Sequence, residues 1–201
     1  MTPLDRAASL AKAKGIGAAG FARGYFDRLA DILAGIDAVA VGELVGLLER
    51  ARERNALIAF CGNGGKAAIC AEWANDLGIE AGSNFRAISL CENAAVLTSI
   101  ANDEGYQFIF ARQVEVLLRP GDVLVALSAS GASANVRKAA KAARNLGATT
   151  VALTGTAGSP LGGAADLEVC ANTGPDECGL SEDAHMAIMH AVVNWLMRAG
   201  T

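Results

Sequence analysis

Short apolar runs alternate with amphipathic stretches over most of this chain. Five runs have the length of a buried strand: Ala56–Cys61, Arg86–Leu90, Asp122–Leu127, Thr149–Thr154 and Leu167–Ala171. Apolar residues recur at helical spacing between and after them, in Gly65–Leu77, Ala94–Ile100, Tyr106–Leu118, Ala132–Leu146 and Ser181–Arg198. Continuous apolar strands that alternate with helices are typical of a parallel sheet covered on both faces. The pattern therefore predicts an α/β fold, a three-layer α-β-α sandwich with a five-stranded parallel sheet.

The residues before the first strand predict an N-terminal helical extension. Helical spacing recurs there in Leu4–Lys14, Gly20–Leu33 and Ile36–Arg54. No stretch further along the chain is long enough to link two domains, so we expect one domain over 1–201, with helices over 1–54 and an α/β core over 55–201. The extension carries apolar stripes that pack within the chain or between copies of it: Phe21, Tyr25, Leu29, Ile32, Leu33, Val41, Leu44, Leu47 and Leu48.

Composition and charge narrow the class of protein. The chain is 52% hydrophobic and 19% charged, which is typical of a globular protein with a real core. The net charge of -4, without a basic run, disfavours nucleic acid as a direct ligand, so an anionic substrate would have to be attracted locally. We see no signal peptide or membrane span, and the five cysteines form no CxxC pair. A cytoplasmic protein with reduced thiols is the expectation.

Two small-residue turns are the strongest indication of chemistry. Cys61–Lys66 and Ser128–Ser133 each follow an apolar strand and precede a helix. Backbone N–H groups and a helix N-terminus at such a turn attract an anion. Ligands of parallel sheets bind beyond the carboxyl ends of the strands, where both turns lie. We therefore predict that the hydroxyls of Ser128, Ser130 and Ser133 form the main phosphate grip, with the N–H groups of Asn63–Gly65 alongside.

The first turn also fits other phosphate loops partially. Gly62 and Gly64, with Ala67 after them, match a dinucleotide-binding pattern, but Glu80 precedes the next strand instead of ending it. A P-loop fails because Phe60 occupies the position of its first glycine. A glycine-rich strand-to-helix turn without any ligand remains the plain alternative.

An ordered set of motifs resembles the sugar isomerase (SIS) domain and, within it, the sedoheptulose-7-phosphate isomerase (phosphoheptose isomerase) group. The motifs are CGNGG at 61–65, ANDL at 74–77, AISL at 87–90, IAND at 100–103, GDVL at 121–124, SASGASANV at 128–136, VALTG at 151–155 and LSEDAH at 180–185. The resemblance implies a flavodoxin-like SIS fold and a homotetramer.

The same resemblance implies an aldose-ketose isomerase. Its substrate would be sedoheptulose 7-phosphate and its product D-glycero-D-manno-heptose 7-phosphate, a precursor of lipopolysaccharide and other surface polysaccharides. The alternative is a non-catalytic SIS protein that binds a sugar phosphate or a protein partner of the replication-initiator type.

The resemblance also implies the site residues. Glu72, Asp76, Glu182 and His190 stand where the group has metal ligands and acid-base groups, typically His, Glu, Gln and His. One divalent metal, zinc by resemblance, is therefore a candidate cofactor, although His190 is the only nitrogen ligand left. Asp76 is the first choice of base and Glu72 the second, while His190 would polarise the carbonyl or move the hydroxyl proton. The expected substrate-binding residues are Asn63, Gly64, Gly65, Lys66, Asn102, Asp103, Ser128, Ser130, Ser133 and Glu182.

Lys66 and the two histidines leave alternatives. Lys66 replaces a serine of the group, and it could contact the phosphate, pair with Glu72 in place of a metal's charge, or be a plain surface lysine. His185 and His190 lie five residues apart, about 140° around a helix, so they should not hold one metal together. We expect His185 to be a hydrogen-bonded residue behind the site or at a subunit interface.

Overall fold

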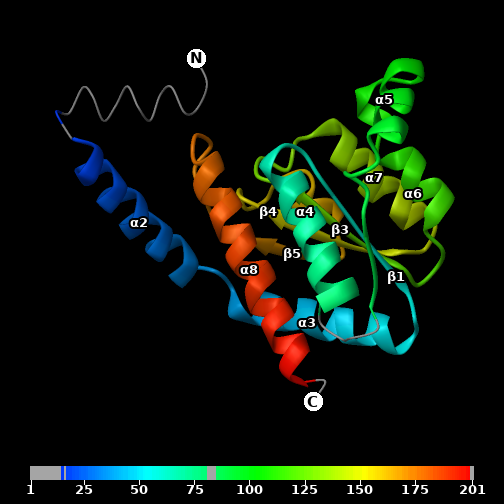
Figure 1. Ribbon diagram of the computed structural model, residues 1–201, viewed down its shortest axis with the longest axis horizontal. Coiled ribbons are helices and arrows are strands. Elements are labelled where there is room, and N and C mark those ends of the chain that lie inside the picture. The colour runs from blue at the N-terminus through cyan, green and yellow to red at the C-terminus, as the bar shows by residue number, and fades with distance from the viewer. Residues whose placement is uncertain (1–14, 16, 81–84, 200–201) are drawn as a thin grey trace.

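The computed structural model describes residues 15, 17–80 and 85–199. Five parallel strands form one sheet: β1 (Leu57–Gly62), β2 (Arg86–Ser89), β3 (Val123–Ser128), β4 (Thr149–Thr154) and β5 (Leu167–Cys170). Their spatial order is β2-β1-β3-β4-β5 (Figure 1). The predicted five-stranded parallel sheet of the flavodoxin-like type is thus confirmed.

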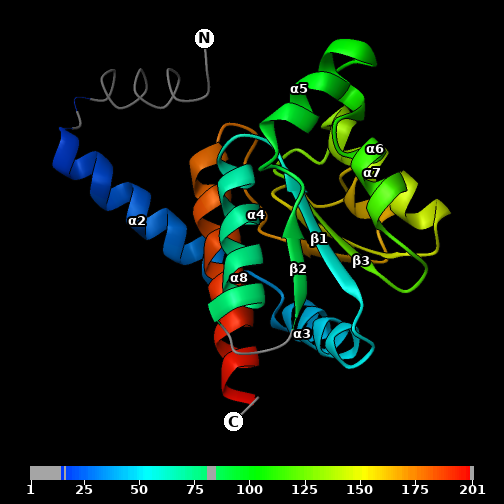
Figure 2. The same ribbon diagram turned by 45° about the vertical axis from the view of Figure 1, so that its right-hand side comes forward.

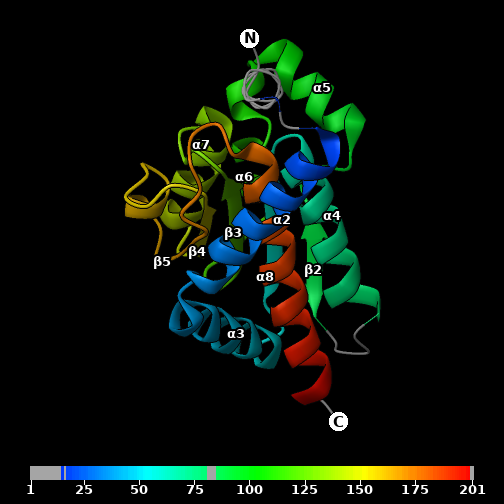
Figure 3. The same ribbon diagram turned by 90° about the vertical axis from the view of Figure 1, so that its left-hand side faces the viewer.

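Helices cover both faces of the sheet, as Figures 2 and 3 show. α3 (Ala38–Glu53), α4 (Gly65–Asn75) and α8 (Cys178–Ala199) pack on one face. α5 (Ala94–Asp103), α6 (Ala111–Leu117) and α7 (Ala134–Asn145) pack on the other. Neighbouring residues of β1 point to opposite faces, so Phe60 stacks on Trp73 of α4 at 5.0 Å between ring centroids, while Ala59 joins the core below α6 and α7.

The N-terminal extension contains two described helices. α2 (Ala18–Ala34) and α3 match the predicted helical stretches, whereas the predicted helix Leu4–Lys14 lies outside the described residues. None of the described helices is long and apolar enough to cross a membrane. All five cysteines are free thiols, as expected.

The predicted helix over 65–77 changes its geometry near its end. α4 stops at Asn75, and a π-helical turn follows over Asp76–Glu80. Within this wider turn Leu77 is fully buried in the core while Ile79 is exposed.

The predicted helix over 106–118 is interrupted. A 3-10 turn (Tyr106–Phe108) is followed by α6 from Ala111, and Ile109 and Phe110 between them are both buried. The break therefore lies at a point where the chain packs directly on the core.

Asp122 fastens the start of the sheet. Its buried carboxylate accepts hydrogen bonds from the backbone N–H of Leu57 at 2.8 Å and of Arg119 at 2.7 Å, which ties β1 to the entry of β3.

Replacing Asp122 with alanine leaves both donors unpaired. We expect Asp122→Ala to lower the free energy of unfolding by about 2–4 kcal/mol in urea denaturation. Glu43→Ala is the control: it removes an exposed carboxylate from α3 and should change the free energy of unfolding by less than about 0.5 kcal/mol. Equal effects of the two changes would contradict the role of Asp122.

Candidate functional site

The two predicted turns meet at one cavity of about 320 Å³. β1 pairs with β2 on one side and β3 on the other, and Gly62 lies opposite Leu127 in the register, so both turns leave the sheet side by side. This reversal of strand order is where flavodoxin-like sheets bind ligands. The lining residues are Asn63, Lys66, Leu127, Ser128, Ala129, Ser130, Ser133, Thr156, Gly174, Pro175, Cys178 and Glu182. They include most of the predicted substrate-binding residues.

The serine turn is open toward this cavity. The buried Ser128 hydroxyl donates to Ser133 Oγ at 3.2 Å, and Ser133 is the N-cap of α7 without using its side chain for capping. Gly131 has a φ of +61°, and its N–H donates to Ser128 O at 3.0 Å, so the turn requires glycine there. Hydroxyls and the α7 N-terminus thus converge on the cavity, an arrangement that suits a phosphate group.

The glycine turn, in contrast, already holds an anion of the protein. The Glu182 carboxylate lies so close over Gly65, the first residue of α4, that any side chain at this position would collide with it. A helix N-terminus favours negative charge, and here that charge comes from α8. The two turns therefore differ: the α7 N-terminus is free for a ligand, whereas the α4 N-terminus faces Glu182.

Lys66 is not a surface lysine. Only 5% of it is exposed, and its Nζ lies 3.5 Å from Glu182 Oε1. The suggested pairing with Glu72 is also wrong, because Glu72 is exposed on α4 and the ammonium pairs with Glu182. The cavity therefore contains a matched positive and negative charge beside the serine turn.

An amide pair holds the two turns together. Asn63 Nδ2 donates to Asn135 Oδ1 at 3.0 Å, Asn135 Nδ2 donates to Asn63 Oδ1 at 2.7 Å, and the Tyr106 hydroxyl donates to the same Asn63 oxygen at 2.9 Å. Asn135 is buried and belongs to α7. Sequence reasoning missed Asn135 and Tyr106 as supports of the site, although Asn135 lies within the SASGASANV motif.

The predicted metal ligands are not gathered in the described part of the chain. Glu72 and His190 are exposed and Asp76 is half-buried, and none of them lines the cavity. Residues 17–80 and 85–199 contain no group of three His, Cys, Asp or Glu side chains placed to hold a metal. Eight residues of α8, about 12 Å along its axis, separate His190 from Glu182. These residues of a single chain do not fit a metal ion, so the metal and the roles of Asp76 and His190 stay predictions.

Asn102 and Asp103 lie elsewhere. Both are exposed in the last turn of α5, where Asn102 Nδ2 donates to Asp103 Oδ1 at 2.8 Å, and neither lines the cavity. Their predicted contact with the substrate would require a ligand that reaches beyond the cavity of one chain.

Comparison with known proteins decides the family. Residues 24–155 match the SIS domain. This chain belongs to the SIS domain family. It is 37% identical to the phosphoheptose isomerase of Rhodospirillum rubrum over 156 residues, which are 76% of this chain and 82% of that protein. These matches confirm the predicted resemblance to the phosphoheptose isomerase group.

Solved structures agree with this family. Phosphoheptose isomerase from Neisseria gonorrhoeae superposes on this SIS domain with a TM-score of 0.79 at 31% identity, covering 89% of this chain and 95% of the other. A phosphoheptose isomerase from Francisella tularensis has the same fold, with a TM-score of 0.83 at 24% identity, covering 91% of this chain and all of the other.

His185 stands behind the cavity of this SIS domain. It is fully buried, and its Nε2 lies 3.1 Å from the carbonyl oxygen of Thr154, so the neutral ring donates to the end of β4. The expected hydrogen-bonded role is confirmed. Burial in the core lowers the pKa of His185 to about 4.

This lowered pKa predicts a loss of stability in mild acid. As the pH falls below the ordinary histidine pKa of 6.5, the unfolded chain takes up a proton that the folded chain refuses. The contribution of the neutral His185 ring to the free energy of unfolding is fully present above pH 6.5. It should shrink by about 2 kcal/mol between pH 7 and pH 5. His185→Gln should show a shallower decline than the wild type in urea denaturation over this range. Parallel declines would contradict the assignment.

Proposed function

We propose that this SIS domain is an aldose-ketose isomerase that interconverts sedoheptulose 7-phosphate and D-glycero-D-manno-heptose 7-phosphate. The observation that carries the proposal is one cavity in which a serine turn at the α7 N-terminus faces an ion pair, in a chain whose relatives are named phosphoheptose isomerases. In the cell, we propose, this reaction takes place in the cytoplasm and supplies heptose for lipopolysaccharide or another surface polysaccharide.

The chemistry of this reaction fits the cavity. Isomerisation needs an anchor for the phosphate, a base that moves a proton between neighbouring carbons, and a positive group that stabilises the enediolate. Ser130 and Ser133 supply the anchor, while Lys66 and Glu182 supply opposite charges within the same space. A single copy thus contains the elements of a sugar-phosphate isomerase.

A non-catalytic sugar-phosphate-binding protein is the second candidate. Glu72 favours it, because it stands where the group typically has a metal-binding histidine, and it is exposed in this chain. Turnover of a panel of sugar phosphates with five to seven carbons, with and without added divalent metal, separates the two. Specific binding without any turnover would favour the non-catalytic protein.

The serine turn gives a direct test of the phosphate anchor. Ser130→Ala combined with Ser133→Ala removes two hydroxyl donors to a charged group, each contributing about 1.5–3 kcal/mol. We expect KM for the sugar phosphate to rise at least tenfold in steady-state kinetics, or its Kd to rise equally in calorimetry. Thr98→Ala, an exposed hydroxyl on α5, is the matched control and should leave both values unchanged. Unchanged affinity of the double variant would refute this anchor.

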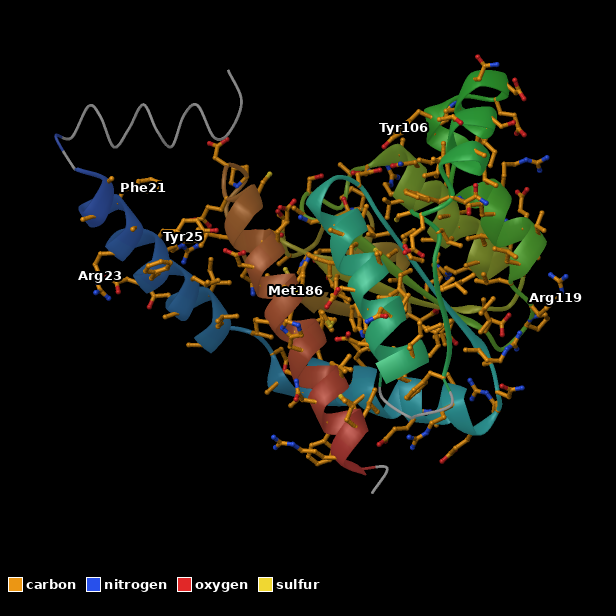
Figure 4. All side chains as sticks on the ribbon, in the orientation of Figure 1. Phe21, Arg23, Tyr25, Tyr106, Arg119 and Met186 are labelled. Atoms are coloured by element: carbon orange, nitrogen blue, oxygen red, sulfur yellow. The ribbon has the colours of Figure 1, made fainter. Side chains whose placement is uncertain are left out.

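We also propose that the protein assembles as a homotetramer through its N-terminal helices. α2 reaches outward from the body of the domain (Figures 1 and 2). Figure 4 shows Tyr25 on the side of α2 that faces α8, where its hydroxyl donates to Asp183 at 2.5 Å, and Arg23 on the opposite side. Phe21, Phe26 and Leu33 remain 43%, 60% and 38% exposed. Such apolar exposure on a projecting helix supports contact with another copy.

Light scattering tests this assembly. At micromolar concentration the wild type should have four times the mass of one chain, and Phe26→Glu should reduce that mass because it places a charge in an apolar contact. Lys141→Glu changes an exposed residue of α7 and serves as the control, with no effect expected. A wild-type protein with the mass of one chain would contradict the proposal.

A further inference from the structure

We propose that Lys66 and Glu182 form the proton-transfer pair of this site, with Glu182 as the carbon base and Lys66 as the group that stabilises and protonates the enediolate oxygen. This inference rests on the proposed isomerase function. It assigns the acid-base work to Lys66 and Glu182, whereas the sequence had pointed to Asp76, Glu72 and His190 for that work.

The first argument is the position of the pair. Lys66 is buried and has its Nζ 3.5 Å from a carboxylate oxygen of Glu182, whose side chain is 37% exposed and lines the cavity. A buried ammonium is stabilised only where a partner compensates for the lost water. The ammonium is thereby fixed on the cavity side of α4, and the carboxylate next to it remains accessible to a ligand.

The second argument is that the chain makes room for this carboxylate. Gly65 leaves the space that the Glu182 carboxylate occupies, at the first residue of α4, where the helix dipole favours a negative charge. Two features therefore place the Glu182 carboxylate: the space over Gly65 and the Lys66 ammonium. Fixed placement of a base against its substrate is what proton transfer needs.

The third argument is that the anchor and the charged pair come from different elements of the fold. The carbonyl and the phosphate of a heptose 7-phosphate lie at opposite ends of the sugar, so the anchor and the reacting groups must occupy different parts of one cavity. Ser130 and Ser133 come from the turn after β3, Lys66 from α4 and Glu182 from α8, and all four line the cavity. Asp76 and His190 do not line this cavity in the described chain.

The two residues also depart from the group's pattern together. Lys66 stands where the phosphoheptose isomerase group typically has serine, and Glu182 where it typically has glutamine. Each departure alone would add a net charge to the site. Because they pair with one another, the site gains an acid and a base without a change in its net charge.

The reaction balances with this pair alone. The Glu182 carboxylate takes a proton from C1 of the ketose, the electrons form the C1–C2 double bond, and Lys66 donates a proton to the oxygen on C2. The neutral Lys66 amine then removes the proton from the oxygen on C1 as the C1 carbonyl forms. Protonated Glu182 returns its proton to C2, so both residues recover their starting states and no other reactant is needed.

Steady-state kinetics with chemical rescue tests the pair. Glu182→Ala and Lys66→Ala should each lower kcat by about 10² to 10⁴-fold while KM stays within about threefold, because the serine anchor remains. Added formate should raise the kcat of Glu182→Ala at least tenfold, and added ethylamine should do the same for Lys66→Ala. A merely structural ion pair would give no such rescue. Lys141→Met and Glu43→Gln change exposed charges outside the cavity, and these matched controls should retain the wild-type kcat.

Conservative variants keep the test decisive if the alanine variants unfold. Glu182→Gln keeps the shape without the base, and Lys66→Arg keeps the charge but does not release a proton at accessible pH, so both should retain the fold and lose kcat. Stable variants with unchanged kcat, or a loss of kcat that small acids and amines do not rescue, would overturn the pair while leaving the isomerase function intact. A wild type that turns over no sugar phosphate would overturn both.

Discussion

The parallel pairing of β1 with β3 is the contact on which the site depends. Gly62 and Leu127 are partners in this ladder, so the residues that follow each strand leave the sheet as neighbours. Helices α4 and α7 then begin side by side on opposite faces of the sheet, and the Asn63–Asn135 amide pair locks the two starting points together. Because most residues that line the cavity come from the ends of these two strands, the turns after them and the start of α8, a shift in this register would disrupt the site.

Two adjacent helix N-termini would attract anions equally if nothing else distinguished them. Glu182 removes this symmetry, since its carboxylate covers Gly65 at the start of α4 and leaves the start of α7 open. A bare carboxylate in the cavity would repel a phosphate, and Lys66 offsets that repulsion at 3.5 Å. In a protein with a net charge of -4, this local compensation allows an anionic sugar to approach the serine turn.

The periodicity of the sequence was sufficient for the strands, because a buried parallel strand is a continuous apolar run with little ambiguity. It missed the places where the backbone leaves regular α-helical geometry, at the π-helical turn after Asn75 and between Phe108 and Ala111, because apolar spacing does not report the hydrogen-bond pattern of a turn. The serine turn was predictable because its residues are contiguous. The contact between Lys66 and Glu182 was not predictable, because it joins positions more than a hundred residues apart. No local sequence pattern indicates which of several acidic residues will pair with a buried lysine.

Polar residues at different positions along α8 lie in different environments. Glu182 lies at the cavity, His185 is buried one turn further, and His190 emerges on the surface, as does Glu72 on the neighbouring α4. Groups that are exposed in one chain can be enclosed only by another surface. The expected metal site therefore depends on the proposed assembly. To enclose a metal on Glu72 and His190, another copy of the chain would have to contact them, whereas the Lys66–Glu182 pair is complete within a single chain.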